Sequence, residues 1–308
     1  MRFLLMHYHP GEIQVQERAG VRDIAARKNN IYSEIPLAAK TFLESQPFLI
    51  LGAADDDGAV WASVWFGTPG FIKVEDSQHA IINGLPDSQD PFSLCLYPSN
   101  PIAAIAVDFA TRRRMRLNGR IGEIQPNGFQ VRAEQVYSNC PKYIQAREWT
   151  LREGPSVEPV AQALETLSEE VVTLVNKADT FFIATQHLQY GTDVSHRGGM
   201  PGFVRAEDDR TLVFPDYSGN AMFNTLGNAV CYPQAGLLFM DFDSGSLIQL
   251  TGTVEILWDV TPFAHWFQDA QRIIRFHLER GIITSHAMSL SWRTVQYSPA
   301  NPSVVVES

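Results

Sequence analysis

The sequence predicts a mainly β protein with flanking helices, an α+β chain in which one antiparallel barrel domain occurs twice. Short β-rich runs alternate with turn residues at spacings of roughly 8–12 residues, which is typical of antiparallel barrels. A repeat is also present, because Pro69-Gly70-Phe71 returns as Pro201-Gly202-Phe203, 132 positions later (201 minus 69). Asp108-Phe109 likewise matches Asp241-Phe242 at an offset of 133 (241 minus 108), which indicates one inserted residue between the two matches. A shared register over this length indicates a duplicated domain, whose halves can pair like the protomers of a dimer.

In the first half, helices are expected over residues 12–28 and from Ile35-Pro36 to Glu44, with proline at an early helical position. Turns are expected at Asp55–Gly58 and at Asn83-Gly84, where the dipeptide favours a hairpin. The expected strands of the first copy are 48–51, 60–66, 71–74, 80–82, 102–107, 117–124 and 128–133.

The second copy repeats this order, with expected strands over 181–185, 192–196, 203–205, 211–214, 236–242 and 247–256. Gly154-Pro155 marks a linker, and residues 157–177 are expected to form a helix with a restart at Ser168. Apolar residues near a 3.6-residue period predict another helix over 262–281. The expected domains are an N-terminal helical extension (1–46), a degenerate first barrel (47–153), and a linker helix, ligand-binding second barrel and C-terminal helix (154–308).

The composition of the chain limits the kinds of ligand and partner that the protein is expected to bind. A net charge of −10 argues against a nucleic-acid partner, which needs a basic face, but allows an anionic small ligand at a local cluster of donors. The three cysteines lack metal-ligand spacing, so neither a disulfide framework nor a metal site is expected. Residues 1–6 are too short an apolar run for a signal peptide or membrane span, so a cytoplasmic protein without a membrane partner is expected. A homodimer is left open.

Comparison of the two copies isolates polar residues that the fold does not require. At the offset of 132, Arg197 stands where the first copy has Trp65, beside His196 and two glycines, Gly198 and Gly199. Arg197 is either a surface arginine on a strand or a ligand for an anion such as phosphate, since its planar fork of donors suits phosphate. Ser195 shares the side of Arg197, because side chains alternate along a strand.

A second polar segment, 216–228, opens as a loop and continues as a short helix, with Phe92 of the first copy opposite Asn224. Its hydroxyl and amide side chains serve either as ordinary turn and cap residues or as a phosphate site at a helix N-terminus. The residues singled out here are Tyr217, Ser218, Asn220, Asn224 and Thr225.

A third segment, Tyr137–Ile144, places Cys140 before Pro141, where a helix could begin with Lys142 and Tyr143 in its first turn. Lys142 is either solvated or in contact with an anion across the interface between the copies. The basic run Arg112-Arg113-Arg114 with Arg116 is either a turn on a solvated face or the positive wall of the same site.

These three segments resemble the pyridoxamine 5′-phosphate oxidase-like, FMN-binding split-barrel family, in a bacterial subgroup with two tandem barrels. The resemblance runs from about residue 40 to about residue 260. It implies two tandem six-stranded antiparallel split β-barrels with FMN in the cleft between them. Carried over by position, Ser195, Arg197, Asn220, Asn224 and Thr225 are expected to bind the cofactor. The full set of expected cofactor-binding residues adds Lys142, His196, Gly198, Tyr217 and Ser218.

The chain departs from the vitamin B6 oxidases of this family, which have an Arg-Lys pair where it has Asn224-Thr225. The resemblance therefore implies an FMN-dependent oxidoreductase-like protein acting with a small-molecule redox substrate or electron donor, not with vitamin B6, and no catalytic residue is assigned. Two alternatives remain. One is a haem-binding or haem-degrading split barrel with His196 or His286 as axial ligand, and the other is a non-catalytic flavin carrier or assembly module.

Overall fold

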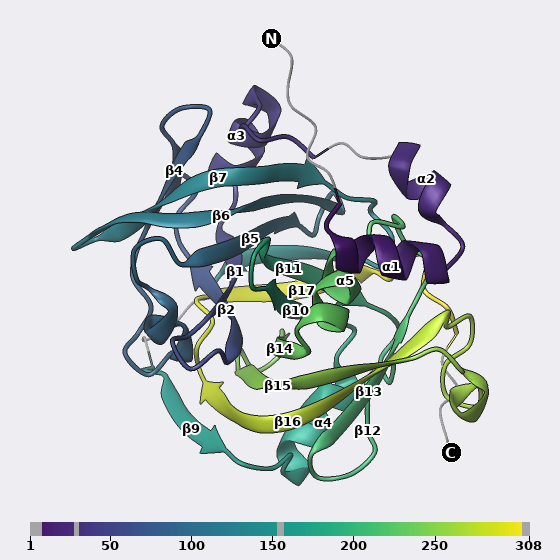
Figure 1. Ribbon diagram of the computed structural model, residues 1–308. Helices are drawn as coiled ribbons and strands as arrows, with labels where there is room; N and C mark the ends of the chain where they lie inside the picture. The colour runs from purple at the N-terminus through teal and green to yellow at the C-terminus, as the bar shows by residue number, and fades with distance from the viewer. Residues whose placement is uncertain (1–7, 28–30, 153–156, 304–308) are drawn as a thin grey trace.

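The computed structural model describes residues 8–27, 31–152 and 157–303 (Figure 1). Three helices precede the first sheet: α1 (Pro10–Arg18), α2 (Arg22–Arg27) and α3 (Leu37–Glu44). His9 caps α1 in a reciprocal arrangement with Glu12. The single helix expected over 12–28 is wrong, because Gly20 adopts a left-handed φ of 69° and separates α1 from α2. The linker expected at Gly154-Pro155 lies outside the described residues.

The first copy forms one antiparallel sheet in the order β2-β1-β5-β6-β7-β4-β3. Its strands are β1 (Phe48–Ala54), β2 (Val60–Phe66), β3 (Ile72–Val74), β4 (His79–Asn83), β5 (Pro101–Asp108), β6 (Arg113–Gln125) and β7 (Gly128–Ser138), with a 3₁₀ turn, η1 (Pro91–Cys95), after β4. Every expected strand of this copy is present. The hairpin expected at Asn83-Gly84 is wrong: β3 and β4 are joined at residues 75–78, and Gly84 leads the chain away toward η1.

The second copy forms a sheet in the order β11-β10-β14-β15-β16-β13-β12, element for element the order of the first, with β9 (Val160–Leu164) added on β16. The remaining strands are β10 (Thr180–His187), β11 (Gly191–Gly198), β12 (Arg205–Ala206), β13 (Thr211–Asp216), β14 (Gln234–Met240), β15 (Leu247–Leu257) and β16 (Arg272–Ser285). The sheets therefore hold seven and eight strands instead of six, and neither pairing pattern closes on itself.

Of two further expected helices, one is confirmed only from its expected restart at Ser168, and the other is wrong. Residues 157–177 divide into the strand β9 and the helix α4 (Glu169–Lys177), which Ser168 caps. Residues 262–281 form only a short 3₁₀ turn, η2 (Thr261–Phe263), before β16. The physical reason lies in distant partners, since β16 pairs with β15, β13 and β9, and buried Ile274, Phe276 and Leu278 alternate along it.

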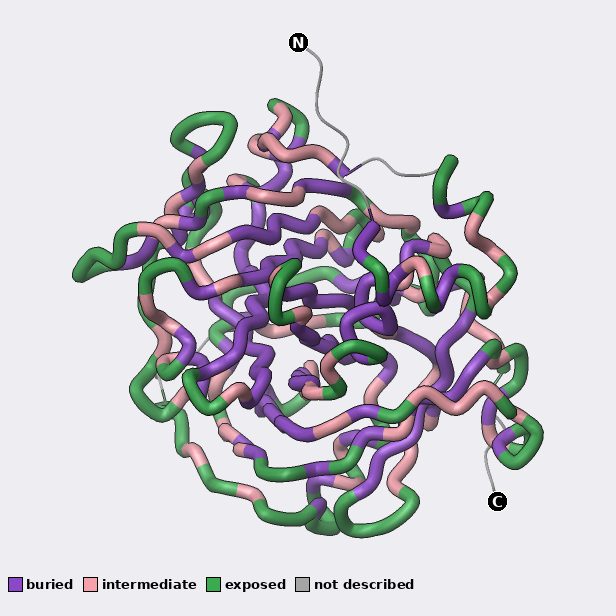
Figure 2. Tube along the Cα trace, in the orientation of Figure 1, coloured by how far each residue is buried: buried purple, intermediate pink, exposed green. Residues whose placement is uncertain are grey.

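The two sheets pack against each other through a shared apolar core (Figure 2). Phe48, Ile50 and Ile105 of the first copy meet Phe182 and Leu238 of the second in this core. Each copy also has its own core, and a small strand pair, β8 (Ala146–Leu151) with β17 (Leu290–Gln296), joins the end of the first copy to the end of the chain. No helix among the described residues is long and apolar enough to cross a membrane.

Candidate functional site

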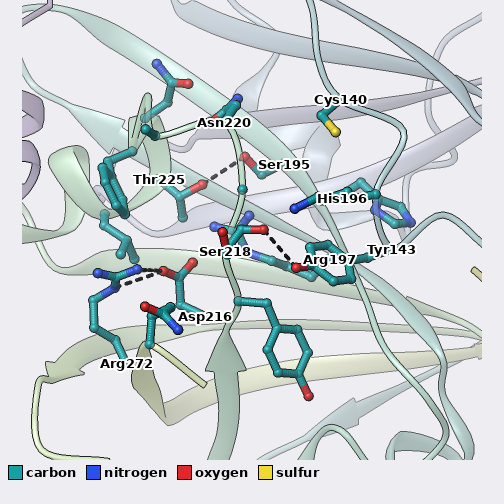
Figure 3. A pocket seen from close by; sticks show the side chains of 18 of the residues that line it. Cys140, Tyr143, Ser195, His196, Arg197, Asp216, Ser218, Asn220, Thr225 and Arg272 are labelled. Atoms are coloured by element: carbon teal, nitrogen blue, oxygen red, sulfur yellow. Dashed lines mark hydrogen bonds and ion pairs between the residues drawn. The ribbon is translucent and has the colours of Figure 1, made fainter. Parts of the chain in front are cut away.

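A cavity of about 430 Å³ lies where the two copies meet (Figure 3). The second copy contributes β11 and the segment from β13 to the start of α5 (Asn224–Cys231), and the first copy contributes β6 and residues 140–143. Ala19 and Val21, between α1 and α2, and Ile24 of α2 also line the cavity. All ten residues expected to bind a cofactor line this one cavity: Lys142, Ser195, His196, Arg197, Gly198, Tyr217, Ser218, Asn220, Asn224 and Thr225. Their role toward a cofactor stays a prediction.

On β11, Ser195 is held by hydrogen bonds from both sides of the cavity. Its hydroxyl accepts from Arg116 Nη2 at 2.7 Å and from the Thr225 hydroxyl at 2.8 Å, and it donates to Asp193. His196 points to the other face, where its Nδ1 lies 3.2 Å from Arg114 Nη1. Burial, with Arg114 beside it, holds the pKa of His196 well below its usual range, so the ring is neutral.

The glycines of β11 serve packing. A Cβ on Gly198 would lie 2.0 Å from the carbonyl oxygen of Tyr143, and one on Gly199 would lie 2.5 Å from the ring of Phe203. Close approach to a ligand is therefore not needed to explain them. Tyr143 itself has a φ of 67° and belongs to a turn, so the helix expected to begin at Pro141 is not formed.

The basic run at residues 112–116, at the start of β6, contributes both to a solvated face and to the wall of the cavity, the two roles that the sequence left open. Arg114 and Arg116 line the cavity, whereas Arg113 is exposed and Arg112 donates to the carbonyl of Ile144. Arg116 is buried and ion-paired with Asp193, which also accepts from Tyr137 and Ser195. Asp193 thus fixes the direction of the Arg116 guanidinium from behind the cavity wall.

The start of α5 is held by the N-terminal helix (Figure 1). Asn224 donates to Glu12 Oε1 at 2.5 Å, and a Cβ on Gly11 would lie only 2.2 Å from the Gly227 carbonyl oxygen. Burial raises the pKa of Glu12 to about 7. Asn220 accepts from the Met222 amide, so for this residue the ordinary turn role is present.

The charge of the cavity opposes that of the whole chain. Five cationic side chains line it, Arg114, Arg116, Lys142, Arg197 and Arg272, against one carboxylate, Asp216. Asp216 is paired with Arg272 at 2.8 Å. Within the described part of the chain, no carboxylate lies within ion-pair distance of Arg114, Lys142 or Arg197. Burial, together with neighbouring Arg116 and Arg197, lowers the pKa of Arg114 to about 9, so the cluster is electrostatically strained and an anion would relieve it.

Arg272, Asp216 and the N-terminal residues of the wall are not among the ten residues predicted from the sequence. Arg272 lies in a segment predicted to be helical, although the register of the repeat gives the second copy a strand after β15, as β7 follows β6 in the first. Of the two histidines named as haem ligands, His196 lines the cavity and His286 does not.

One group of metal-ligand type comes together in the described residues. The ligand atoms of His9, His187 and Cys231 lie within 4.8 Å of one another. Both imidazoles accept backbone N–H groups at Nδ1, from Gly11 at 3.2 Å and from Gln189 at 3.1 Å. A neutral ring in this tautomer keeps its proton on Nε2, so neither ring offers a free lone pair to a metal.

The sequence profile described as "Pyridoxamine 5'-phosphate oxidase" matches residues 167–298, a segment that contains every predicted site residue except Lys142. No curated protein shows significant sequence similarity to the chain. Similar solved structures include a putative pyridoxamine 5′-phosphate oxidase from Lactobacillus delbrueckii, with 16% identity, 38% of this chain and 93% of that chain covered, and a TM-score of 0.33.

A FAD-binding protein from Mesorhizobium loti is 12% identical over 42% of this chain and 98% of that chain, with a TM-score of 0.30. An FMN-binding protein from Syntrophomonas wolfei is 11% identical over 41% of this chain and 86% of that chain, with a TM-score of 0.28. Similarity this distant carries no argument of its own. The sequence match shows that residues 167–298 are similar to the pyridoxamine 5′-phosphate oxidase family.

Proposed function

We propose that the cavity between the copies binds a flavin noncovalently, FMN in the first place, and that the chain is an oxidoreductase-like flavoprotein. The observation that carries the proposal is a cluster of cations, Arg114, Lys142 and Arg197, that have no carboxylate partner among the described residues of a chain with net charge −10. Such a cluster fits an anionic group, and the domain that supplies most of the wall is pyridoxamine 5′-phosphate oxidase-like.

The residues fit the two ends of a flavin mononucleotide. Arg197 and Arg114 would meet the phosphate, with Arg116 held in direction by Asp193 and the hydroxyls of Ser195 and Thr225 beside it. The neutral Asn224 binds Glu12, so the arginines of the strands would supply the charge that the helix start lacks. In this assignment the cations that meet the phosphate come from β6 and β11, whereas in the vitamin B6 oxidases an Arg-Lys pair stands at the position of the start of α5.

The aromatic end of the cavity suits a flat ring. Tyr143 and Tyr217 have ring centroids 5.4 Å apart, and the Tyr143 hydroxyl donates to the Ser218 carbonyl at 2.8 Å, which closes this side of the cavity. A bound flavin would supply electron or hydride transfer, and the protein would supply orientation and exclusion of water. In this proposal the two sheets serve as paired split-barrel units, with a small-molecule substrate or electron donor reaching the flavin from solvent.

The absorption spectrum of the purified chain, before and after addition of FMN, tests the proposal. We expect flavin absorption that remains with the protein after desalting, and quenching of flavin fluorescence in a titration with a single saturating site. A parallel titration with FAD measures the preference for FMN. Absence of flavin binding in both titrations would reject the proposal, and a Soret band on haem addition would favour the haem alternative.

A further inference from the structure

A second cavity, of about 330 Å³, lies at the position that the repeat relates to the first. Its walls come from β2, from the segment between β4 and η1, and from β15 of the other copy. The repeat register maps Trp65 onto Arg197, with an offset of 132, and Leu247 and Gln249 onto Arg114 and Arg116, with an offset of 133. The two cavities are therefore built from equivalent strands: the first from β11 of the second copy and β6 of the first, and the second from β2 of the first copy and β15 of the second.

The second cavity has the opposite charge. Each of the three arginines at these positions is replaced by a neutral residue: tryptophan, leucine or glutamine. Its described lining residues include Asp87 and Asp90 and contain no lysine or arginine. A phosphate would meet only negative charge here, so this cavity cannot be a second copy of the proposed flavin phosphate site.

The carboxyl group of Asp90, in the wall of the second cavity, accepts three hydrogen bonds. Oδ1 accepts from Gln249 Nε2 at 3.0 Å and from the Phe92 amide at 2.9 Å, whereas among the described residues Oδ2 accepts only from the Ser63 hydroxyl. A carboxylate oxygen accepts about two hydrogen bonds, so Oδ2 retains a lone pair for one more donor. Burial raises the pKa of Asp90, and a cation placed beside the carboxylate would reverse that effect.

The remaining walls are apolar. Val64, Phe66 and Leu247 line the cavity, and its volume lies within the range of pockets that hold small molecules. Trp65 also lines it, and the buried indole Nε1–H has no hydrogen-bond partner among the described residues. A cationic ligand offers no acceptor to this donor, so the ligand preference of the cavity depends on Asp90 and the apolar walls.

We propose that the second cavity binds a small planar organic cation of the aromatic amidinium or protonated heterocyclic amine class. Its N–H donors meet Asp90 and its ring lies against Val64, Phe66 and Leu247. This site does not depend on flavin binding at the first cavity, and its ligand preference is the inverse of that proposed for the first.

Benzamidine and benzoate are suitable probes for the full-length chain, because they have similar shape and opposite charge. We expect calorimetry to detect one benzamidine site that saturating FMN does not displace, and no benzoate binding there. Asp90→Asn should weaken benzamidine binding about tenfold or more, since a charge-assisted hydrogen bond is lost. Asp57→Asn, at an exposed carboxyl in the β1–β2 turn, should leave it unchanged.

Leu247→Arg provides a second variant, because it introduces the residue type of the first cavity at the matching position. It should also abolish benzamidine binding. Because Leu247 is buried, Gln89→Lys, at an exposed residue of the same cavity, decides the matter if either variant lowers the melting temperature enough to disturb the fold. Equal affinities for the two probes, displacement of benzamidine by FMN, or losses no larger than that of Asp57→Asn would overturn the proposal.

Discussion

Replacing Arg197 by alanine should weaken ligand binding without destabilising the protein. Arg197 lines the 430 Å³ cavity and has no carboxylate within ion-pair distance in the described part of the chain. Burial, with Arg116 nearby, lowers the pKa of Arg197, so its charge is held at a cost in the unliganded protein. A hydrogen bond to a charged group contributes about 1.5–3 kcal/mol, which corresponds to roughly a 10- to 150-fold loss of FMN affinity. The free energy of unfolding should change by less than about 1 kcal/mol, or rise.

The assay is a fluorescence titration of FMN with wild type, Arg197→Ala and Arg113→Ala, combined with urea unfolding of each unliganded protein. Arg113 is the matched control, because it belongs to the same basic cluster and is exposed on β6. The reasoning is refuted if both variants lose the same affinity, or if Arg197→Ala destabilises the unliganded protein by several kcal/mol while Arg113→Ala does not.

Three further outcomes follow from the site. Asp193→Asn should lower the free energy of unfolding by about 3–5 kcal/mol, measured in urea, because it leaves the buried Arg116 without its counterion. Burial raises the pKa of Glu12 from 4.5 to about 7, so folding favours the protonated carboxyl. The contribution of this group to the free energy of unfolding is therefore fully present below pH 4.5 and is lost as pH rises through 7. The loss amounts to about 3 kcal/mol, and Glu12→Gln should flatten that part of the stability–pH curve; an unchanged curve would contradict the assignment. Gly198→Ala should cost about 1–3 kcal/mol in thermal unfolding, since its Cβ would lie 2.0 Å from the Tyr143 carbonyl oxygen, and a neutral effect would show that the turn can move.

The strand pattern of the first copy could be predicted because alternation and turn residues are local signals. Segment 272–285 could not, because Ile273, Ile274 and Leu278 fit a helical period as well as a strand. Its partners β15, β13 and β9 decide between the two, and β13 and β9 lie far away in the chain. The first part of the helix expected over 157–177 is wrong for a similar reason, since it pairs with the distant strand β16 as an edge strand.

The sequence by itself determined which residues to compare: the repeat register set Arg197 against Trp65 and Asn224 against Phe92, and all ten predicted residues line one cavity. Only the tertiary structure decided how their charges are balanced. It pairs Arg116 with Asp193 and Asn224 with Glu12, and it leaves Arg114 and Arg197 without a carboxylate partner among the described residues. Hydrogen bonds and ion pairs depend on distances of a few ångströms between residues that are as much as 212 positions apart here, and no local pattern in a sequence encodes such distances.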